Sequence, residues 1–302
     1  MILCLDLLRM VGNYIGHKQL EEFVEKSCLQ NKVELLKFIW NMVTTFDELK
    51  LQHHLKYACR HGSTSIVSFL LSIPCIRKYM SVEYACMPLI TVCCRYANVD
   101  TLLILCSSGC YSRAMFAKNS ATIYNAVVHG KSSLVLEHFI QLKIFEHFPQ
   151  SFIEDTIRNG CSEIVQFLYH KQYLQRNMVT LNNAALFQCA CEYGHADLAL
   201  FLWNTFSICR QDLGSNCLLF QHLLFDGNVC VLQCLWDANI LTKGDICVSQ
   251  LSFTYAFFCN RLDLCLFAIN KLEYFEQLHF LRSIANTLHG ERKEKFINYF
   301  FL

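Results

Sequence analysis

Proline and charge are both scarce in this chain of 302 residues, which has three prolines, 17% charged residues and a net charge of +1. The near balance of 26 basic and 25 acidic residues excludes a general electrostatic attraction to nucleic acid or to anionic lipid. Stretches without Asp, Glu, Lys or Arg are short, and residues 246–260 are among the longest. A membrane-spanning helix needs about 20 apolar residues, so we expect no membrane insertion.

Sequence motifs of known enzymes are also missing. The chain has no Gly-rich phosphate loop, no G-x-S-x-G turn and no H-E-x-x-H pair. We therefore expect a non-enzymatic protein without a catalytic residue, a cofactor or a metal. The N-terminus, MILCLDLLRM, carries Asp6 and Arg9 and has no small-residue cleavage site, so it is unlike a secretory signal.

A pattern of two short amphipathic helices recurs about every 33 residues. Its first helix ends at a hinge residue, usually Gly or Asn, and apolar residues follow the hinge by four, five, seven and eight positions, as in residues 55–71. These offsets place the apolar residues on one face of a second helix. A period of this length indicates stacked helix pairs. The hinges are expected at Asn31, Gly62, Ala97, Gly130, Gly160, Gly194, Gly227 and Asn260.

The preference for Gly or Asn at the hinge follows from the way a helix ends, because a residue with a left-handed backbone is common at that position. Gly adopts this conformation freely, whereas a left-handed Ala costs about 1 to 2 kcal/mol, so we prefer Asn98 over Ala97 as the turn residue. The buried face of that unit would then contain Leu102, Leu103 and Leu105. The unit around Gly130 is expected to hold an added residue before Phe139. Loops between helix pairs are expected to contain the three prolines, Pro74, Pro88 and Pro149.

Cysteine is abundant, with 19 residues, but they are spread along a chain that looks unsecreted, which argues against a disulfide framework. Several occupy apolar positions of the repeat and are expected to be small, reduced core residues: Cys59, Cys191, Cys230, Cys234 and Cys265. Cys189, Cys191 and His195 lie close in sequence, but a closed zinc site commonly uses a C-x2-C pair and a second pair elsewhere. We interpret them as packing residues.

CACEYGHADLALFLW at residues 189–203 and YACRHGSTSIVSFLL at residues 57–71 resemble the helix pairs of ankyrin repeats in pattern and period. The resemblance implies an all-α, ankyrin-like helix-pair solenoid of about eight repeats over residues 25–270. Residues 1–24 are then an N-terminal cap and residues 271–302 a C-terminal helical cap. The usual Thr-Pro-Leu-His start and the hairpin segment are both missing, so β-hairpin fingers are expected to be short, irregular or absent.

This Cys- and Phe-rich array is similar to ankyrin-type proteins secreted by intracellular bacteria and to multigene-family proteins of African swine fever virus. The resemblance implies a non-enzymatic module that binds a host or cellular protein and modulates host defence. We expect a cytoplasmic monomer, in the host cytosol if the chain comes from a pathogen or virus. The alternative is an adaptor that recruits a host ubiquitin ligase through its C-terminal tail, although that tail contains no proline and so no Leu-Pro start of an F-box-like segment.

In ankyrin arrays the two residues before each hinge project into a concave groove, where a protein partner binds. At the matching positions the front half of this chain is basic and aromatic, so it is expected to engage an acidic or mixed polypeptide segment. The predicted partner-binding residues are Arg60, His61, Arg95, Tyr96, His129, Arg158, Asn159, Glu192, Tyr193, Phe225 and Phe258. The remaining matching positions hold Val128, Asp226 and Cys259.

Overall fold

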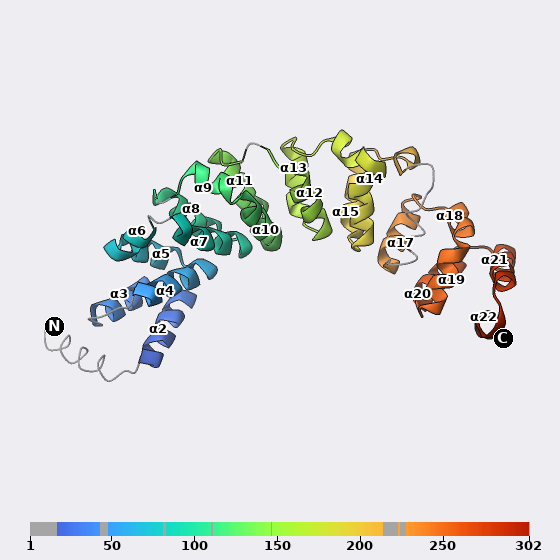
Figure 1. Cartoon of the computed structure of the whole chain (residues 1–302), viewed down its shortest axis with the longest axis horizontal. Helices are drawn as coiled ribbons and strands as arrows, with labels where there is room; N and C mark the ends of the chain where they lie inside the picture. Colours follow the sequence, from blue (N-terminus) through green and yellow to red (C-terminus); the bar gives the residue numbers. More distant parts are fainter. Residues whose placement is uncertain are drawn as a thin grey trace. The chain divides into compact units, whose positions relative to one another are not determined.

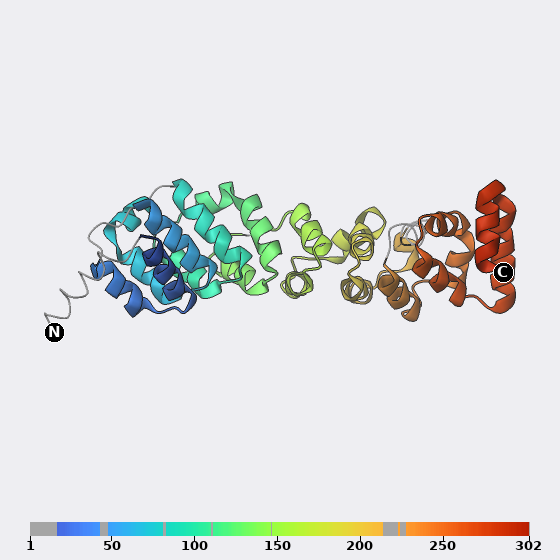
Figure 2. The same ribbon diagram turned by 90° about the horizontal axis from the view of Figure 1, so that it is seen from below.

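The computed structural model describes residues 17–42, 48–80, 83–109, 111–145, 147–213, 223 and 228–301. In these residues every regular element is a helix, which confirms the all-α class. The chain divides into two compact units, residues 1–155 and 156–302. Within each unit, consecutive helices pack against one another in pairs (Figure 1; Figure 2). The expected division at residues 24 and 270 stays a prediction, and residues 1–16 of the expected N-terminal cap lie outside the described residues.

The helices form pairs that are joined by loops or by shorter helices. Those of the first unit are α2 (His17–Leu29), α3 (Val33–Met42), α4 (Glu48–Arg60), α5 (Thr64–Ser72), α6 (Pro74–Met80), α7 (Glu83–Arg95), α8 (Val99–Ser107), α9 (Arg113–Lys118), α10 (Ser120–Gly130) and α11 (Ser133–Gln141). The helix at the boundary between the units is α12 (Gln150–Arg158). The second unit continues with α13 (Ser162–His170), α14 (Arg176–Glu192), α15 (Ala196–Thr205), η1 (Arg210–Leu213), α17 (Val229–Asp237), α18 (Lys243–Val248), α19 (Gln250–Phe258), α20 (Leu262–Asn270), α21 (Tyr274–Thr287) and α22 (Gly290–Phe300).

Most hinges lie where the repeat pattern predicts them. A left-handed backbone, with φ between 48° and 81°, is found at Asn31, Gly62, Gly160, Gly194 and Asn260. The N–H after the hinge then donates to the carbonyl five positions earlier, as in Ser63 to Ala58 at 3.0 Å. This bond closes the C-terminus of the first helix of the pair. Gly227 lies outside the described residues.

The preference for Asn98 as a turn residue is wrong. Ala97 is the left-handed residue, with φ of 55°, whereas Asn98 has φ of −84° and is the N-cap of α8. The side chain of Asn98 has another role, because its Nδ2 donates to the carbonyl oxygens of Cys59 and Arg60, both at 2.8 Å. Two hydrogen bonds to the preceding pair offset the strain of a left-handed alanine.

The shift by one residue also changes the buried face of α8. Thr101, Leu102 and Leu105 are fully buried, whereas Leu103, expected in the core, is 36% exposed. Thr101 therefore lies four residues after the hinge, where other pairs have an aliphatic residue. Its hydroxyl has no hydrogen-bond partner among the described residues, so a polar group is buried here in an otherwise apolar layer.

The next hinge lies at Lys131, one residue after Gly130. Lys131 has φ of 51° and caps α10. Counted from Lys131, three of the four apolar positions are fully buried, namely Val135, Leu136 and Phe139. The fourth, seven residues after the hinge, holds the half-buried His138, so the unit needs no added residue. Gly130 has a different role, because a Cβ at this position would overlap the carbonyl oxygen of Cys94. Glycine allows α10 to approach the backbone of α7 closely.

Short helices occupy several connections between pairs. They are α6, α9 and α18, together with the first part of α14, which is separated from the rest by left-handed residues at Asn182, Asn183 and Ala184. The described residues contain no strand, so no hairpin finger forms there. Pro74 begins α6 and Pro149 precedes α12, but Pro88 lies inside α7, so its expected place in a loop is wrong.

The residue after a hinge links its pair to the preceding one. The Ser63 hydroxyl donates to the carbonyl of Cys28, and Nε2 of His195 hydrogen-bonds to the carbonyl oxygen of Arg158 at 2.9 Å. Asn98 makes the corresponding contacts in its pair. These side chains satisfy carbonyl groups at the end of a helix, which have no partner within that helix.

Aromatic side chains fill the core of both units. In the first unit, the fully buried Phe139 lies 5.4 Å from Phe145 between ring centroids. In the second unit, the fully buried Phe253 lies 5.1 Å from Phe280 and 6.0 Å from Phe300. These contacts join α19 to α21 and α22.

Replacing Ala97 by glycine is expected to raise the free energy of unfolding by about 1 kcal/mol, because glycine adopts the left-handed conformation without strain. Chemical denaturation followed by circular dichroism measures the change. The matched control is Ala126→Gly in the interior of α10, which should lower the free energy of unfolding by about 1 kcal/mol. Equal destabilisation of the two variants would contradict the left-handed conformation of Ala97.

Candidate functional site

A groove of about 660 Å³ lies over α4, α7 and the N-terminal end of α10, all in the first unit. We call it the α4–α7 groove. Its lining includes three of the predicted partner-binding residues, Arg60, Arg95 and Tyr96. The start of α10 closes one side through Asn119 and Thr122.

The polar face of α4 forms one wall of the α4–α7 groove, with His53, Lys56, Tyr57 and Arg60. Spacings of three and four residues place these side chains on one side of the helix. The opposite side of α4 is fully buried in the core, through Leu55, Ala58 and Cys59. Because the core fixes the rotation of α4, it also fixes where the two cations of the wall point.

The floor of the α4–α7 groove comes from α7 and is mainly apolar, with Met87, Pro88 and Val92 along it and Arg95 at its end. Pro88 has no N–H and cannot donate the helical hydrogen bond. The helix nevertheless continues through it to Arg95. The ring of Pro88 is exposed, so it presents a rigid apolar surface to the groove.

Arg60 is held in place from two directions. Its guanidinium lies over the ring of Tyr96, 5.0 Å from the centroid, and its carbonyl accepts the hydrogen bond from Asn98. This cation–π contact restrains the guanidinium, whose several N–H groups can still bind an acceptor. The contact also joins two consecutive helix pairs, since Arg60 ends α4 and Tyr96 follows α7.

The α4–α7 groove is positively charged. Among the described residues, Lys56, Arg60 and Arg95 line it, and no Asp or Glu does. Within the described part of the chain, none of these three cations forms an ion pair with a carboxylate. Their charge is therefore available to an anionic ligand, whose approach it would steer.

The other predicted residues of the first unit lie outside this lining. The ring of His61 lies tilted against Tyr57, with ring centroids 4.5 Å apart, and His129 is exposed on α10. Val128 is only 3% exposed, so its expected projection into a groove is wrong. The cause is the hinge at Lys131, which moves Val128 to a core position.

In the second unit, Arg158 lies over the ring of Tyr193 at 5.7 Å, which repeats the geometry of Arg60 and Tyr96. Glu192 is exposed beside Tyr193, and Asn159 is exposed as well. Phe258 is half-buried, with the guanidinium of Arg292 over its ring at 5.4 Å. Phe225 and Asp226 lie outside the described residues, and Cys259 is exposed.

Several lining residues lie outside the two positions before each hinge, so the repeat pattern did not predict them. These are His53, Lys56, Tyr57, Met87, Pro88, Thr91, Val92, Asn119 and Thr122. A signal was present in the sequence. Counting back four and seven residues from Arg60 follows the same helical face and reaches Lys56 and His53.

The buried cysteines are packing residues. Cys94 and Cys191 are fully buried, and this burial raises the pKa of both thiols well above the usual value. Burial likewise raises the pKa of Cys265 to about 12. Such thiols stay protonated at neutral pH and are poor nucleophiles. Cys230, expected in the core, is exposed, so that assignment is wrong, and Cys234 is half-buried.

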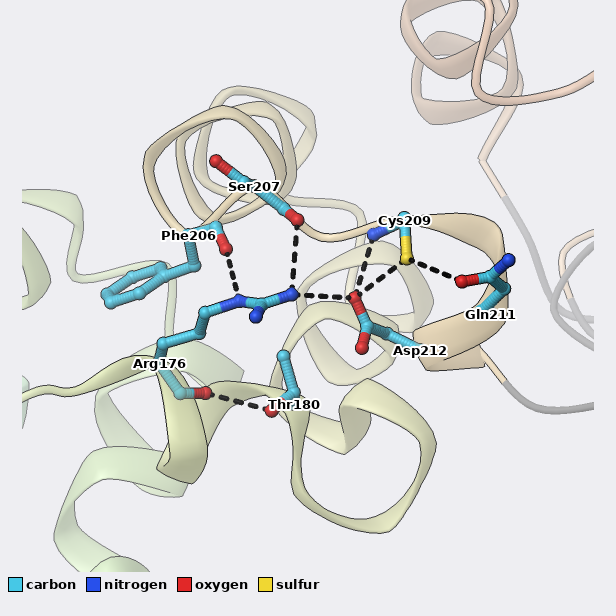
Figure 3. A network of polar contacts seen from close by, with 7 residues as sticks. All are labelled: Arg176, Thr180, Phe206, Ser207, Cys209, Gln211 and Asp212. Atoms are coloured by element: carbon cyan, nitrogen blue, oxygen red, sulfur yellow. Dashed lines mark hydrogen bonds and ion pairs between the residues drawn. The ribbon is translucent and has the colours of Figure 1, made fainter.

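A second polar cluster, in the second unit, satisfies its own charges (Figure 3). Nε of Arg176 donates to the carbonyl of Phe206 at 3.0 Å, and Nη2 donates to the carboxylate of Asp212 at 3.3 Å. The backbone N–H and the thiol of Cys209, followed by Arg176, hold the pKa of Asp212 below its usual value. This cluster fastens the start of α14 to the end of α15 and to η1, and we interpret it as structural.

Comparison with known proteins gives no family. No protein-family model matches the chain, and no curated protein matches it in sequence. None of the described helices is long and apolar enough to cross a membrane. In the same part of the chain, no group of three or more His, Cys, Asp or Glu residues is arranged to hold a metal ion.

Proposed function

We propose that the chain is an ankyrin-like helix-pair solenoid and a non-enzymatic module that binds an acidic segment of a host or cellular protein. The recurring left-handed hinges and the bonds from each hinge region to the preceding pair support this fold. One observation carries the function, namely three cations beside an apolar floor in the α4–α7 groove that form no ion pair with any carboxylate the structure describes: Lys56, Arg60 and Arg95.

The physical argument is one of complementarity. Arginine and tyrosine are frequent anchors of protein interfaces, because they combine a large contact area with directed polar groups. The cation–π contact with Tyr96 restrains Arg60 before a partner arrives, so less conformational entropy is lost on binding. An acidic segment would satisfy the cations and cover the apolar floor at the same time. The proposed partner is cytoplasmic, and the effect on host defence is part of the same proposal.

The double variant Arg60→Glu/Arg95→Glu is expected to reduce recovery of the partner at least tenfold. A charge-assisted hydrogen bond contributes about 1.5 to 3 kcal/mol, and reversing two charges replaces attraction by repulsion. Quantitative affinity purification from transfected cells, with mass spectrometry, measures the loss. Both residues are exposed, so the fold should be kept, which circular dichroism checks.

The matched control is Arg77→Glu/Arg282→Glu, which alters net charge equally at exposed residues outside the α4–α7 groove. This control should retain all partners. If the groove variant retained the same partners as the control, the proposed function would be wrong.

The adaptor function has its own support, from two large apolar side chains at the start of α21. Tyr274 is 68% exposed and Phe275 is 82% exposed. Exposed aromatic side chains of this size often mark a partner surface. A ubiquitin-ligase subunit that was captured by the wild type, lost with Tyr274→Ser/Phe275→Ser and kept by the groove variant would favour recruitment through the C-terminal tail.

A further inference from the structure

We propose that the α4–α7 groove selects an acidic peptide segment that also carries one large apolar side chain, Leu or Phe, about three residues from a pair of carboxylates. This inference rests on the proposed function and adds the chemistry of the segment. It follows from the order of residues along α7. Pro88 and Val92 come first on the groove face, and Arg95 comes at the end of the helix.

The spacing comes from helix geometry. Pro88 and Arg95 are seven residues apart, which corresponds to about 10 Å along a helix axis. An extended peptide covers about 3.3 Å per residue, so the same distance takes about three residues. A side chain over Pro88 therefore places carboxylates about three positions away, at Arg95.

The end of the α4–α7 groove suits carboxylates in particular. Arg60 and Arg95 come from consecutive pairs and line the same groove, and the guanidinium of Arg60 lies over the ring of Tyr96. A guanidinium in such a contact can still offer two parallel N–H groups, which match the two oxygens of a carboxylate. Lys56 adds a third positive charge on the α4 wall.

The lining favours a peptide over single-stranded nucleic acid, the other common polyanion. A nucleic-acid strand needs cations along its path and aromatic faces on which bases stack. The α4–α7 groove does contain two tyrosines, but the ring of Tyr57 lies against His61 and that of Tyr96 lies against Arg60. The aliphatic side chains of Pro88 and Val92 occupy the floor, and the two arginines lie at the C-terminal ends of α4 and α7. A net charge of +1 adds no general attraction for phosphates.

The test uses the full chain and fluorescein-labelled peptides of about 12 residues on a Gly-Ser background, with binding followed by fluorescence anisotropy. One peptide has a Phe and a Glu-Glu pair three positions after it, and a second has the reverse order. In two further peptides Ser replaces the Phe. Burying a Phe contributes about 1.5 to 3 kcal/mol, so one Phe peptide should bind at least tenfold more tightly than its Ser counterpart.

Protein variants then locate the two contacts. Arg95→Glu should weaken binding of every acidic peptide at least tenfold, whereas Arg77→Glu, outside the groove, should change none. Val92→Ser should reduce the advantage of Phe over Ser and leave the binding of the Ser peptides unchanged. The comparison between Phe and Ser peptides on the wild-type chain needs no variant, so the inference is tested even if Val92→Ser fails to fold.

Three results would overturn the inference. The first is equal affinity for Phe and Ser peptides, the second is no binding of any peptide to the wild type, and the third is displacement of the peptide by an oligouridine of similar charge. The proposed function is judged separately, by recovery of the cellular partner with Arg60→Glu/Arg95→Glu. If the partner were lost with that variant while the Phe and Ser peptides bound equally well, only the proposed contact of the apolar side chain would be rejected.

Discussion

Replacing Gly130 by alanine is expected to lower the free energy of unfolding by about 3 kcal/mol. A Cβ at Gly130 would overlap the carbonyl oxygen of Cys94 and come within 3.3 Å of the carbonyl carbon of Arg95. Both obstacles belong to the backbone of α7, which cannot turn away as a side chain can. α7 and α10 would have to separate, and the buried residues between them would lose contacts. Urea unfolding followed by circular dichroism measures the change.

The control for this prediction is Gly244→Ala in α18. Among the described residues, a Cβ there has only the hydroxyl of Thr242 nearby, at 3.6 Å, which is an ordinary van der Waals distance. Alanine favours a helix more than glycine does, so this variant should be at least as stable as the wild type. A Gly130 variant as stable as the Gly244 variant would show that α7 and α10 do not approach as closely as described.

Replacing Phe253 by alanine is expected to lower the free energy of unfolding by about 4 kcal/mol. Phe253 is fully buried and packs edge-on against Phe280, so its removal leaves a cavity where α19 meets α21. Neighbouring rings can fill only part of that cavity. Chemical denaturation, monitored by near-ultraviolet circular dichroism of the aromatic residues, measures the loss.

Leu251 is the matched control for Phe253, because it lies on the same helix and is 84% exposed. Leu251→Ala removes an exposed side chain and should change stability by no more than about 0.5 kcal/mol. Similar losses from the two variants would contradict the buried position of Phe253.

The hinges could be predicted from sequence where the backbone alone determines the residue. Gly62, Gly160 and Gly194 are left-handed, and glycine adopts that conformation most easily. The prediction failed where a contact with a distant part of the chain determines which residue is needed. Asn98 bonds to carbonyl groups 38 and 39 residues earlier in the chain, and Gly130 is required by the backbone of α7. Neither partner can be recognised from the local sequence.

The candidate site could be predicted only in part for a similar reason. The rule of two residues before each hinge identified Arg60, Arg95 and Tyr96, which the structure places in one groove. It missed the apolar floor, because Pro88 was assigned to a loop and the earlier turns of α4 and α7 were not considered. The distance between consecutive pairs, which decides whether their side chains share a groove, depends on packing between them.

The hydrogen bonds of Asn98 affect more than the stability of the fold. Asn98 does not line the α4–α7 groove, yet it joins the end of α4 to the start of α8. Arg60 lies at that end of α4, and Arg95 lies at the end of α7, just before α8. The separation of the two charged side chains therefore depends on an amide that lies outside the groove lining. A substitution of Asn98, whether engineered or natural, could change that separation while every residue that lines the groove stayed the same.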